Sequence, residues 1–377
     1  MKIFIHIGLY KTGTTYLQKS LFKNISDSEL IYNPSNIMES LSLALKDLYR
    51  YNNLESSVIK HHIESISKEV NVLSTKSNNK PLFISNEGLS QRFTENDYLL
   101  HCKLLKEIFP NAQIFIFLRY QIDYIVSCYK HSILMKKCSY ALKYPAVLAI
   151  NEFLGYKNKS IARRIFKDIS DKSCTYQMKA ESVRFDMLIK IYQIYFSSNN
   201  VHVFFYENLK YDALKEINKI LALLEVNSIK DFPRNISNRS FSAFSVSLLL
   251  TRSTIFSWFR LDRIKIKPIS SSRRKKYIEI NKKQIQLYED SSGISKIYKY
   301  ITWRCNGHYF RIFCFKRFLK DFLDRLLYID YKIIDSNTYN ELENIFYQEN
   351  CTLSALIPKV KMPDIYLRKP HENKDAS

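Results

Sequence analysis

Glycine is scarce in this sequence, which has 6 glycines among 377 residues. Paired cysteines are lacking too, because the 7 cysteines are odd in number, scattered, and form no C-x-x-C pair. They are Cys102, Cys128, Cys138, Cys174, Cys305, Cys314 and Cys351. This pattern indicates neither a disulfide framework nor a zinc site and is typical of a reducing cytoplasm.

Long hydrophobic runs are also lacking. No stretch reaches the ~18 uncharged apolar residues that a membrane span requires. The N-terminal run Ile3–Ile7 is too short for the apolar part of a signal peptide. We therefore expect a cytoplasmic protein and leave open a peripheral contact with the inner membrane surface.

Acidic residues are the minority among the charged ones. Lys and Arg number 58 against 36 Asp and Glu, which gives a formal charge of +22 and a pI near 9.5. Such an excess favours an anionic partner: a nucleotide, nucleic acid, an acidic glycan or an anionic lipid surface. The chain is rich in Lys, Ile, Asn and Tyr together, so part of the positive charge follows from this overall bias in composition. The charge therefore indicates a negatively charged partner but not which one.

Four short apolar runs predict β-strands, namely Ile3–Ile7, Pro81–Ser85, Gln113–Leu118 and Val201–Phe205. Three of them are almost continuously apolar, as expected for strands buried on both faces. The segments between them space apolar residues as helices do, for example at Leu41, Leu45 and Leu48. The expected fold class is α/β: a P-loop-like three-layer domain with a central, mostly parallel sheet flanked by helices, and a largely helical C-terminal region.

Beyond about Ser240 the composition changes. The serine and basic run at 270–276 predicts a solvated loop, with anion binding as the alternative. An apolar stripe from Phe318 to Leu327 predicts a helix on its own core, with membrane-surface docking or an acceptor-binding lid as alternatives. We expect a core at 1–254, a basic, aromatic-rich helical insertion at 255–335, and a C-terminal core helix with a polar tail at 336–377.

The loop after the first predicted strand contains two of the few glycines, Gly8 and Gly13. A strand, a glycine-containing loop and a helix starting near Tyr16 direct several backbone N–H groups to one place, which predicts a phosphate or sulfate site. Lys11 adds a cation, and Thr14 and Thr15 add hydroxyl donors. The alternative is an ordinary strand-to-helix turn with capping threonines.

The position of the lysine distinguishes this loop from that of P-loop NTPases. Their motif G-x-x-x-x-G-K-[ST] places lysine after the second glycine. Here Thr14 occupies that position, and Lys11 precedes Gly13. The sequence HIGLYKTGTTYLQ from His6 to Gln18 instead resembles the 5′-phosphosulfate loop of sulfotransferases that use 3′-phosphoadenosine 5′-phosphosulfate (PAPS), P-K-[TS]-G-T-[TS]-x-L, with Tyr10 in place of the proline.

That resemblance implies that PAPS is the donor and that Lys11, Thr12, Gly13, Thr14 and Thr15 bind it. It also implies an arginine at the end of a later strand and a serine eight residues on, both holding the 3′-phosphate. Arg119 and Ser127 fit this spacing, and Gln121 stands where the family often has proline. Weaker similarities occur at Val201–Leu209, at Asn238 with Ser240, and at Asn350 with Leu353, whereas 255–335 has no counterpart.

Sulfuryl transfer requires positioning and charge stabilisation rather than a covalent enzyme intermediate or a metal. Lys11 is expected to stabilise the bridging oxygen. Glu87, directly after a predicted buried strand, is the candidate base and resembles the catalytic glutamate of glycan sulfotransferases; its alternative role is to anchor the turn at Gly88. The other candidate bases are His6, His101 and His131, although His6 in mid-strand fits a core position better.

Two other functions remain open at this point. One is a P-loop-type nucleotide or small-molecule kinase, and the other is a basic nucleic-acid-binding protein without catalysis. The acceptor expected by analogy is a cell-surface glycan or glycolipid, with no specific nucleic acid as partner. The sequence does not indicate the oligomeric state.

Overall fold

The computed structural model describes residues 1–25, 28–77, 80–90, 95–134, 183–230 and 336–369. The chain divides into two compact units, and the first comprises 1–132, 150–238 and 334–377. All described residues except 133–134 belong to this first unit. The expected insertion at 255–335, the basic run at 270–276 and the Asn238–Ser240 element lie outside the described residues, so the domain boundaries stay a prediction.

The centre of the first unit is a five-stranded parallel sheet with the order β2-β3-β1-β4-β5. Its strands are β1 (Ile3–Gly8), β2 (Ile31–Tyr32), β3 (Leu82–Ser85), β4 (Gln113–Leu118) and β5 (Val201–Phe205). The four expected strands are confirmed, and the two-residue edge strand β2 was not expected. Because β1 lies between β3 and β4, the strand order reverses there, and the carboxyl edge next to it is where α/β proteins bind ligands.

Helices connect the strands. They are α1 (Thr14–Ser20), α2 (Ser35–Tyr51), α3 (Ser57–Lys76), α4 (Glu95–Ile108), α5 (Gln121–Leu134), α7 (Phe185–Phe196), α8 (Tyr206–Tyr211), α9 (Ala213–Leu224) and α15 (Ser336–Leu356). Short 3-10 turns are η1 (Phe22–Asn24), η2 (Glu87–Ser90), η5 (Ser198–Asn200) and η8 (Asp364–Tyr366). The helical stripe Leu41, Leu45 and Leu48 is buried in α2, which packs against α3.

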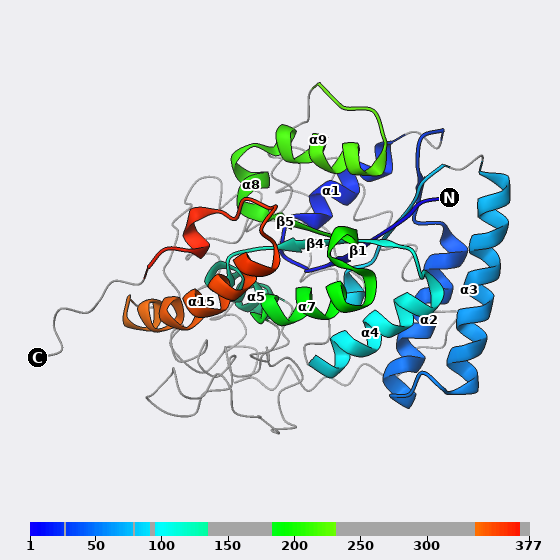
Figure 1. Cartoon of the computed structure of the whole chain (residues 1–377), viewed down its shortest axis with the longest axis horizontal. Helices are drawn as coiled ribbons and strands as arrows, with labels where there is room; N and C mark the ends of the chain where they lie inside the picture. Colours follow the sequence, from blue (N-terminus) through cyan, green and yellow to red (C-terminus); the bar gives the residue numbers. More distant parts are fainter. Residues whose placement is uncertain (26–27, 78–79, 91–94, 135–182, 231–335, 370–377) are drawn as a thin grey trace, which may run out of the picture. The chain divides into compact units, whose positions relative to one another are not determined.

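The two faces of the sheet are covered by different helices (Figure 1). On one face, α1 and α9 pack on a cluster of strand phenylalanines, including Phe115, Phe117 and Phe204. Phe117 and Phe204 stack with their ring centroids 4.9 Å apart. On the other face, α7 packs on β4 and β5, and α4 and α15 pack on α7. Together with the helical C-terminal element α15, this arrangement confirms the expected three-layer α/β fold for the described residues.

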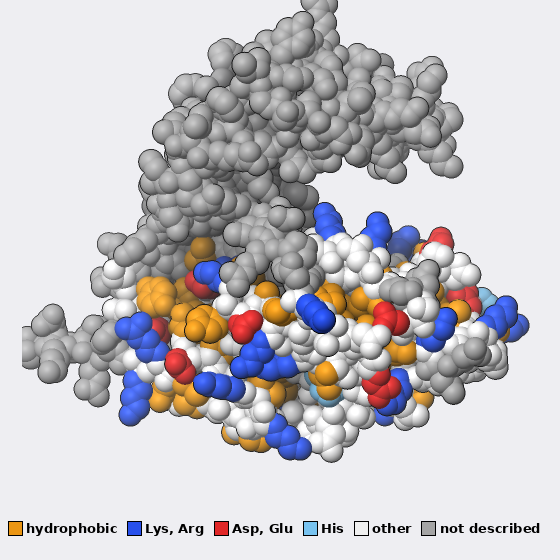
Figure 2. All heavy atoms as spheres, turned by 90° about the horizontal axis from the view of Figure 1, so that it is seen from above, with side chains coloured by type: hydrophobic (Ala, Val, Ile, Leu, Met, Phe, Trp, Pro, Cys, Tyr) orange, Lys and Arg blue, Asp and Glu red, His pale blue; other side chains and the backbone are white. Residues whose placement is uncertain are grey.

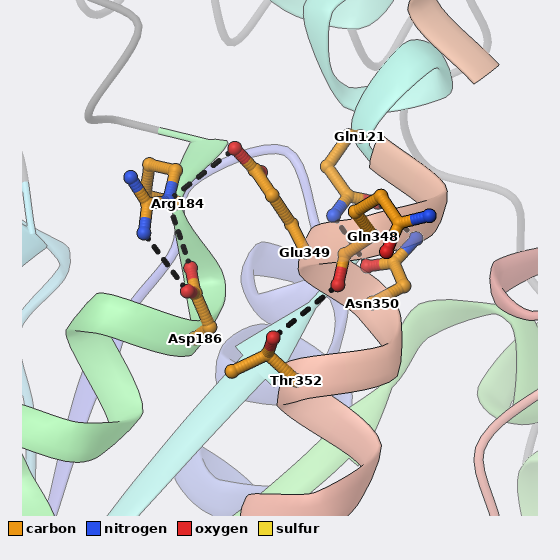
Figure 3. Close-up of polar contacts among 7 residues, drawn as sticks. All are labelled: Gln121, Arg184, Asp186, Gln348, Glu349, Asn350 and Thr352. Carbon is orange, nitrogen blue, oxygen red and sulfur yellow. Dashed lines mark hydrogen bonds and ion pairs between the residues drawn. The ribbon is translucent and has the colours of Figure 1, made fainter. Parts of the chain in front are cut away.

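A charged cluster joins α7 to α15 (Figure 3). Arg184 holds Asp186 through two bonds of 3.0 Å and lies 3.3 Å from Glu349 Oε1. Glu349 Oε2 is buried without a hydrogen-bond partner in the described part of the chain. Burial raises the pKa of Glu349 from 4.5 to about 7, with Arg184 acting against the rise and Asp186 adding to it. The fold therefore favours the neutral carboxyl.

This pKa predicts that Glu349 weakens the fold as the pH rises. A carboxyl whose folded-state pKa is raised contributes its full stability below about pH 4.5 and loses it as the pH rises through about 7. We expect Glu349→Gln to match the wild type at pH 5 and to melt roughly 3 °C higher at pH 8. Thermal melts at both pH values, with exposed Glu64→Gln as the control, measure this effect. A lower melting temperature of Glu349→Gln at pH 8 would show that the Arg184 ion pair outweighs the burial cost.

Candidate active site

The loop between β1 and α1 has a tightly constrained backbone. Gly8, Lys11 and Gly13 all have positive φ angles, of 107°, 69° and 83°. A Cβ on Gly8 would lie 2.3 Å from Ser90 Oγ, and one on Gly13 would lie 3.1 Å from Tyr206 Cδ2. Two of the few glycines are therefore placed where both the backbone conformation and the close approach of a neighbouring side chain disfavour a larger residue.

The loop threonines have different roles. Thr12 is buried, and its hydroxyl donates to the Leu9 carbonyl oxygen at 2.5 Å, so it stabilises the loop itself. Thr14 donates to Glu87 Oε1, also at 2.5 Å. Helix α1 begins at Thr14 rather than near Tyr16, so Thr14 and the half-buried Thr15 form its first turn. The loop predicted to hold the donor is thus bonded directly to the candidate base.

Glu87 stands on the short turn η2, which begins two residues after β3. Its carbonyl oxygen accepts from Ser90 Oγ at 3.1 Å. The N–H of Gly88 is held by the side chain of Asn86 at 2.8 Å, so Asn86 rather than Glu87 anchors that turn. The Glu87 carboxylate is directed to Thr14 instead. This arrangement places the carboxylate just after β3, at the carboxyl edge of the sheet, where it is bonded to the loop.

A polar network centred on Ser85 lies beside this turn. His6 Nδ1 is 2.7 Å from Ser85 Oγ, and Gln18 Nε2 donates to the same oxygen at 2.9 Å. The side chain of Asn33 bonds both backbone groups of Ser85, at 2.7 Å and 3.2 Å. Burial lowers the pKa of His6 to about 3, so the ring is neutral and acts as a core residue. No motif in the sequence indicates this network.

Of the other two histidine candidates, His101 and His131, the structure describes the side chain of His101 alone. His101 is fully buried, with Nδ1 2.6 Å from the Leu89 carbonyl oxygen and Nε2 2.5 Å from the Tyr49 hydroxyl. Both of its ring nitrogens are therefore engaged within the core. His131 is in α5, but its side chain is outside the described residues. Among the base candidates that can be compared, Glu87 is the one bonded to the loop.

Arg119, the arginine of the expected 3′-phosphate motif, lies beside the glycine loop. It follows β4, and its Nη1 donates to the Lys11 carbonyl oxygen at 3.3 Å. Its guanidinium carbon lies 4.7 Å from the centre of the Tyr206 ring, the ring that also approaches Gly13. Arg119 Nε is buried without a hydrogen-bond partner within the described residues. A buried, unpaired guanidinium donor beside the glycine loop fits a phosphate oxygen.

The second turn of helix α5 lies close to both cations, Lys11 and Arg119. Ser127 is half-buried in its second turn. At the next residue, burial raises the pKa of the Cys128 thiol to about 11, and the charges of Lys11 and Arg119 act in the opposite direction. Tyr10, which replaces the family's proline, packs edge-on against Tyr124 of α5 with the ring centroids 5.8 Å apart. An aromatic contact with α5 thus occurs at the position where the family has a rigid proline.

The described residues contain no group of three or more His, Cys, Asp or Glu side chains that could hold a metal ion. No helix within the same ranges is long and apolar enough to cross a membrane.

Figure 2 shows a face on which lysine and arginine side chains lie at several separate places, with acidic and apolar side chains between them.

A comparison with protein-family models agrees with the sequence-based family prediction. A family model described as "Sulfotransferase domain" matches residues 2–298. Among solved structures, the crystal structure of a sulfotransferase from Alicyclobacillus acidocaldarius is similar at 15% identity and a TM-score of 0.39, covering 72% of this chain and 99% of that one. No curated protein matches the sequence. Because the family model matches most of the chain, from the strand before the glycine loop to beyond β5, the protein belongs to the sulfotransferase domain family.

Proposed function

We propose that this protein transfers a sulfuryl group from PAPS to a hydroxyl or amine of an acceptor. Family membership supports sulfuryl transfer as the reaction type. The observation that carries the choice of donor is the meeting of two motifs: Arg119 donates to the Lys11 carbonyl oxygen although 108 residues separate them. Two cationic side chains and the loop amides are thereby gathered at one edge of the sheet, as an anion with two phosphate-type ends requires.

The residues have separate roles in this proposal. PAPS supplies the activated sulfuryl group. Lys11 provides positive charge where the leaving phosphate gains negative charge, and Thr14, Thr15 and the loop N–H groups donate to the anionic oxygens. Arg119, whose Nε has no hydrogen-bond partner in the described structure, binds the 3′-phosphate together with Ser127.

Glu87 is the general base of the proposal. Its carboxylate is bonded to Thr14 of the donor loop, so a group that accepts a proton lies next to the place where the donor would bind. An acceptor hydroxyl placed between Glu87 and the bound donor would give its proton to Glu87 as its oxygen bonds to sulfur and the bond from sulfur to the leaving phosphate breaks. Much of the remaining rate enhancement comes from holding the donor, the acceptor hydroxyl and Glu87 in line, as in phosphoryl transfer.

Replacing Glu87 with glutamine tests the base. We expect kcat to fall by about a hundredfold, because general base catalysis is lost, while the affinity for adenosine 3′,5′-bisphosphate (PAP) stays the same. Transfer of labelled sulfate and calorimetric titration with PAP measure the two quantities. Glu39→Gln, an exposed change on α2, is the matched control. Loss of PAP binding together with turnover would make Glu87 structural instead.

The acceptor is proposed to be a cell-surface glycan or glycolipid. The proposal rests on the similarity of Glu87 to the base of glycan sulfotransferases, and the net charge of +22 favours an acidic polymer or an anionic lipid surface. We place the protein in the cytoplasm, with contact at the inner membrane surface. Incubation with labelled PAPS and separated envelope fractions would identify the acceptor class, and labelling confined to small phenols would contradict it.

A further inference from the structure

The turn after Arg119 is held by a glutamate of helix α8. The backbone N–H of Tyr120 donates to Glu207 Oε1 at 2.9 Å. Glu207 is the second residue of α8 and follows Tyr206, on whose ring the Arg119 guanidinium lies. One glutamate therefore ties the backbone next to Arg119 to the helix that carries the stacking ring.

The second carboxylate oxygen of Glu207 is held by the C-terminal segment, residues 336–369. The Tyr366 hydroxyl donates to Glu207 Oε2 at 3.3 Å. The Tyr366 side chain is 1% exposed and packs edge-on against the rings of Tyr120 and Phe205, with centroids 5.4 Å and 5.0 Å away. Because these rings confine it, the hydroxyl is held in the position from which it donates. Burial raises the pKa of Glu207, but its hydrogen bonds and the charge of Arg119 favour the carboxylate.

Helix α15 of the same segment makes a second link to this turn. Gln121 Nε2 donates to Asn350 Oδ1 at 2.6 Å, and Asn350 Nδ2 donates to Gln121 Oε1 at 3.3 Å (Figure 3). Both side chains are 1% exposed. Gln121 stands where sulfotransferases that use PAPS often have proline. The reciprocal amide pair with Asn350 therefore fixes a turn that a proline ring would otherwise stiffen.

Both links come from a part of the chain that the family match does not include, because that match ends at residue 298. We propose that the C-terminal segment positions Arg119 for the 3′-phosphate of the nucleotide, acting through Glu207 and Gln121. The inference rests on the proposed function, in which Arg119 binds that phosphate. Glu207, Tyr366 and Asn350 are positioning residues, since they hold the backbone and the turn around Arg119.

The change Tyr366→Phe tests this role with the loss of one hydroxyl. We expect the Kd for PAP to rise about fivefold, the equivalent of one net hydrogen bond. The Kd for adenosine 5′-monophosphate, which has no 3′-phosphate, should not change. In kinetics with PAPS, we expect KM to rise by the same factor while kcat stays within about twofold of wild type. Calorimetric titration of the full-length protein with both nucleotides gives the binding values.

The matched control is Tyr192→Phe in α7. Tyr192 is as deeply buried as Tyr366, but its hydroxyl has no hydrogen-bond partner within the described residues. The double variant Glu207→Ala with Tyr366→Phe supplies a second measurement. If Tyr366 acts through Glu207, the double variant should bind PAP no more weakly than Glu207→Ala alone. A purely structural role would lower the melting temperature and leave the preference for PAP over adenosine 5′-monophosphate unchanged.

The outcomes separate this inference from the function on which it rests. If the wild type binds PAP and Tyr366→Phe binds it as tightly as Tyr192→Phe does, the positioning role is overturned and the proposed function stands. If Tyr366→Phe loses affinity for both nucleotides equally, the positioning role is also overturned, because the effect is then not directed at the 3′-phosphate. If the wild type does not bind PAP, the proposed function fails and this inference fails with it.

Discussion

Lys11→Ala is expected to abolish sulfuryl transfer while the protein remains folded. Lys11 is the cation of the glycine loop, and the Arg119 guanidinium donates to its carbonyl oxygen. A positive charge held where a leaving phosphate gains its negative charge stabilises the transition state, and losing such a group costs about a thousandfold in kcat. Alanine tolerates the φ angle of 69° no worse than lysine does, because both carry a Cβ, so the backbone should not change.

Transfer of labelled sulfate from PAPS under saturating conditions measures this effect. The matched control is Lys19→Ala, because Lys19 is an exposed base in the last turn of α1, away from the loop. The control should retain wild-type turnover, and both variants should melt within a few degrees of the wild type. Full activity in Lys11→Ala would refute the assignment of the loop as the donor site.

Arg119→Ala is expected to remove most of the preference for a 3′-phosphate. The planar guanidinium is stacked on Tyr206 and held by the Lys11 carbonyl oxygen, with Nε buried and without a partner in the described structure. A charge-assisted, bidentate bond to phosphate would be lost, which corresponds to about a hundredfold weaker binding of PAP. The variant should then keep only the small preference for PAP over adenosine 5′-monophosphate that Ser127 supplies, and transfer at low PAPS concentration should fall accordingly.

The affinity ratio of the two nucleotides measures this preference. Arg50→Ala is the control, since Arg50 also lies over a tyrosine ring, that of Tyr51, 5.6 Å from its centre, but on α2. Arg119→Lys separates charge from shape, because lysine keeps the charge and loses the planar fork; we expect it to recover only part of the affinity. An unchanged ratio in Arg119→Ala would place the 3′-phosphate elsewhere.

Much of the sheet could be predicted because its strands are buried on both faces. Strands such as Gln113–Leu118 are almost wholly apolar, and this pattern leaves few alternatives. The edge strand Ile31–Tyr32 has only two residues, too few to give a pattern. The start of α1 was expected near Tyr16 but lies at Thr14, because Gly13 already takes the left-handed conformation that precedes the helix.

The candidate site could be predicted where a motif fixes its local geometry, and not where contacts join distant segments. The glycine loop and Arg119 follow from spacing along the chain. The pairing of Gln121 with Asn350 spans 229 residues, and neither residue type indicates the other. Tyr206 and Glu207 belong to a stretch with a weak family similarity, yet their contacts with Gly13, Arg119 and Tyr120 depend on the packing of β5 beside β4.

The bond between Thr14 and Glu87 also bears on the order in which substrates are added. A hydroxyl has a single proton to donate, and in this structure Thr14 donates it to the Glu87 carboxylate. An anion that accepts this hydrogen bond when it binds in the loop would release Glu87 Oε1 from Thr14. Filling of the loop then frees the carboxylate oxygen, so an acceptor hydroxyl that arrives before the donor meets a Glu87 oxygen that Thr14 already occupies.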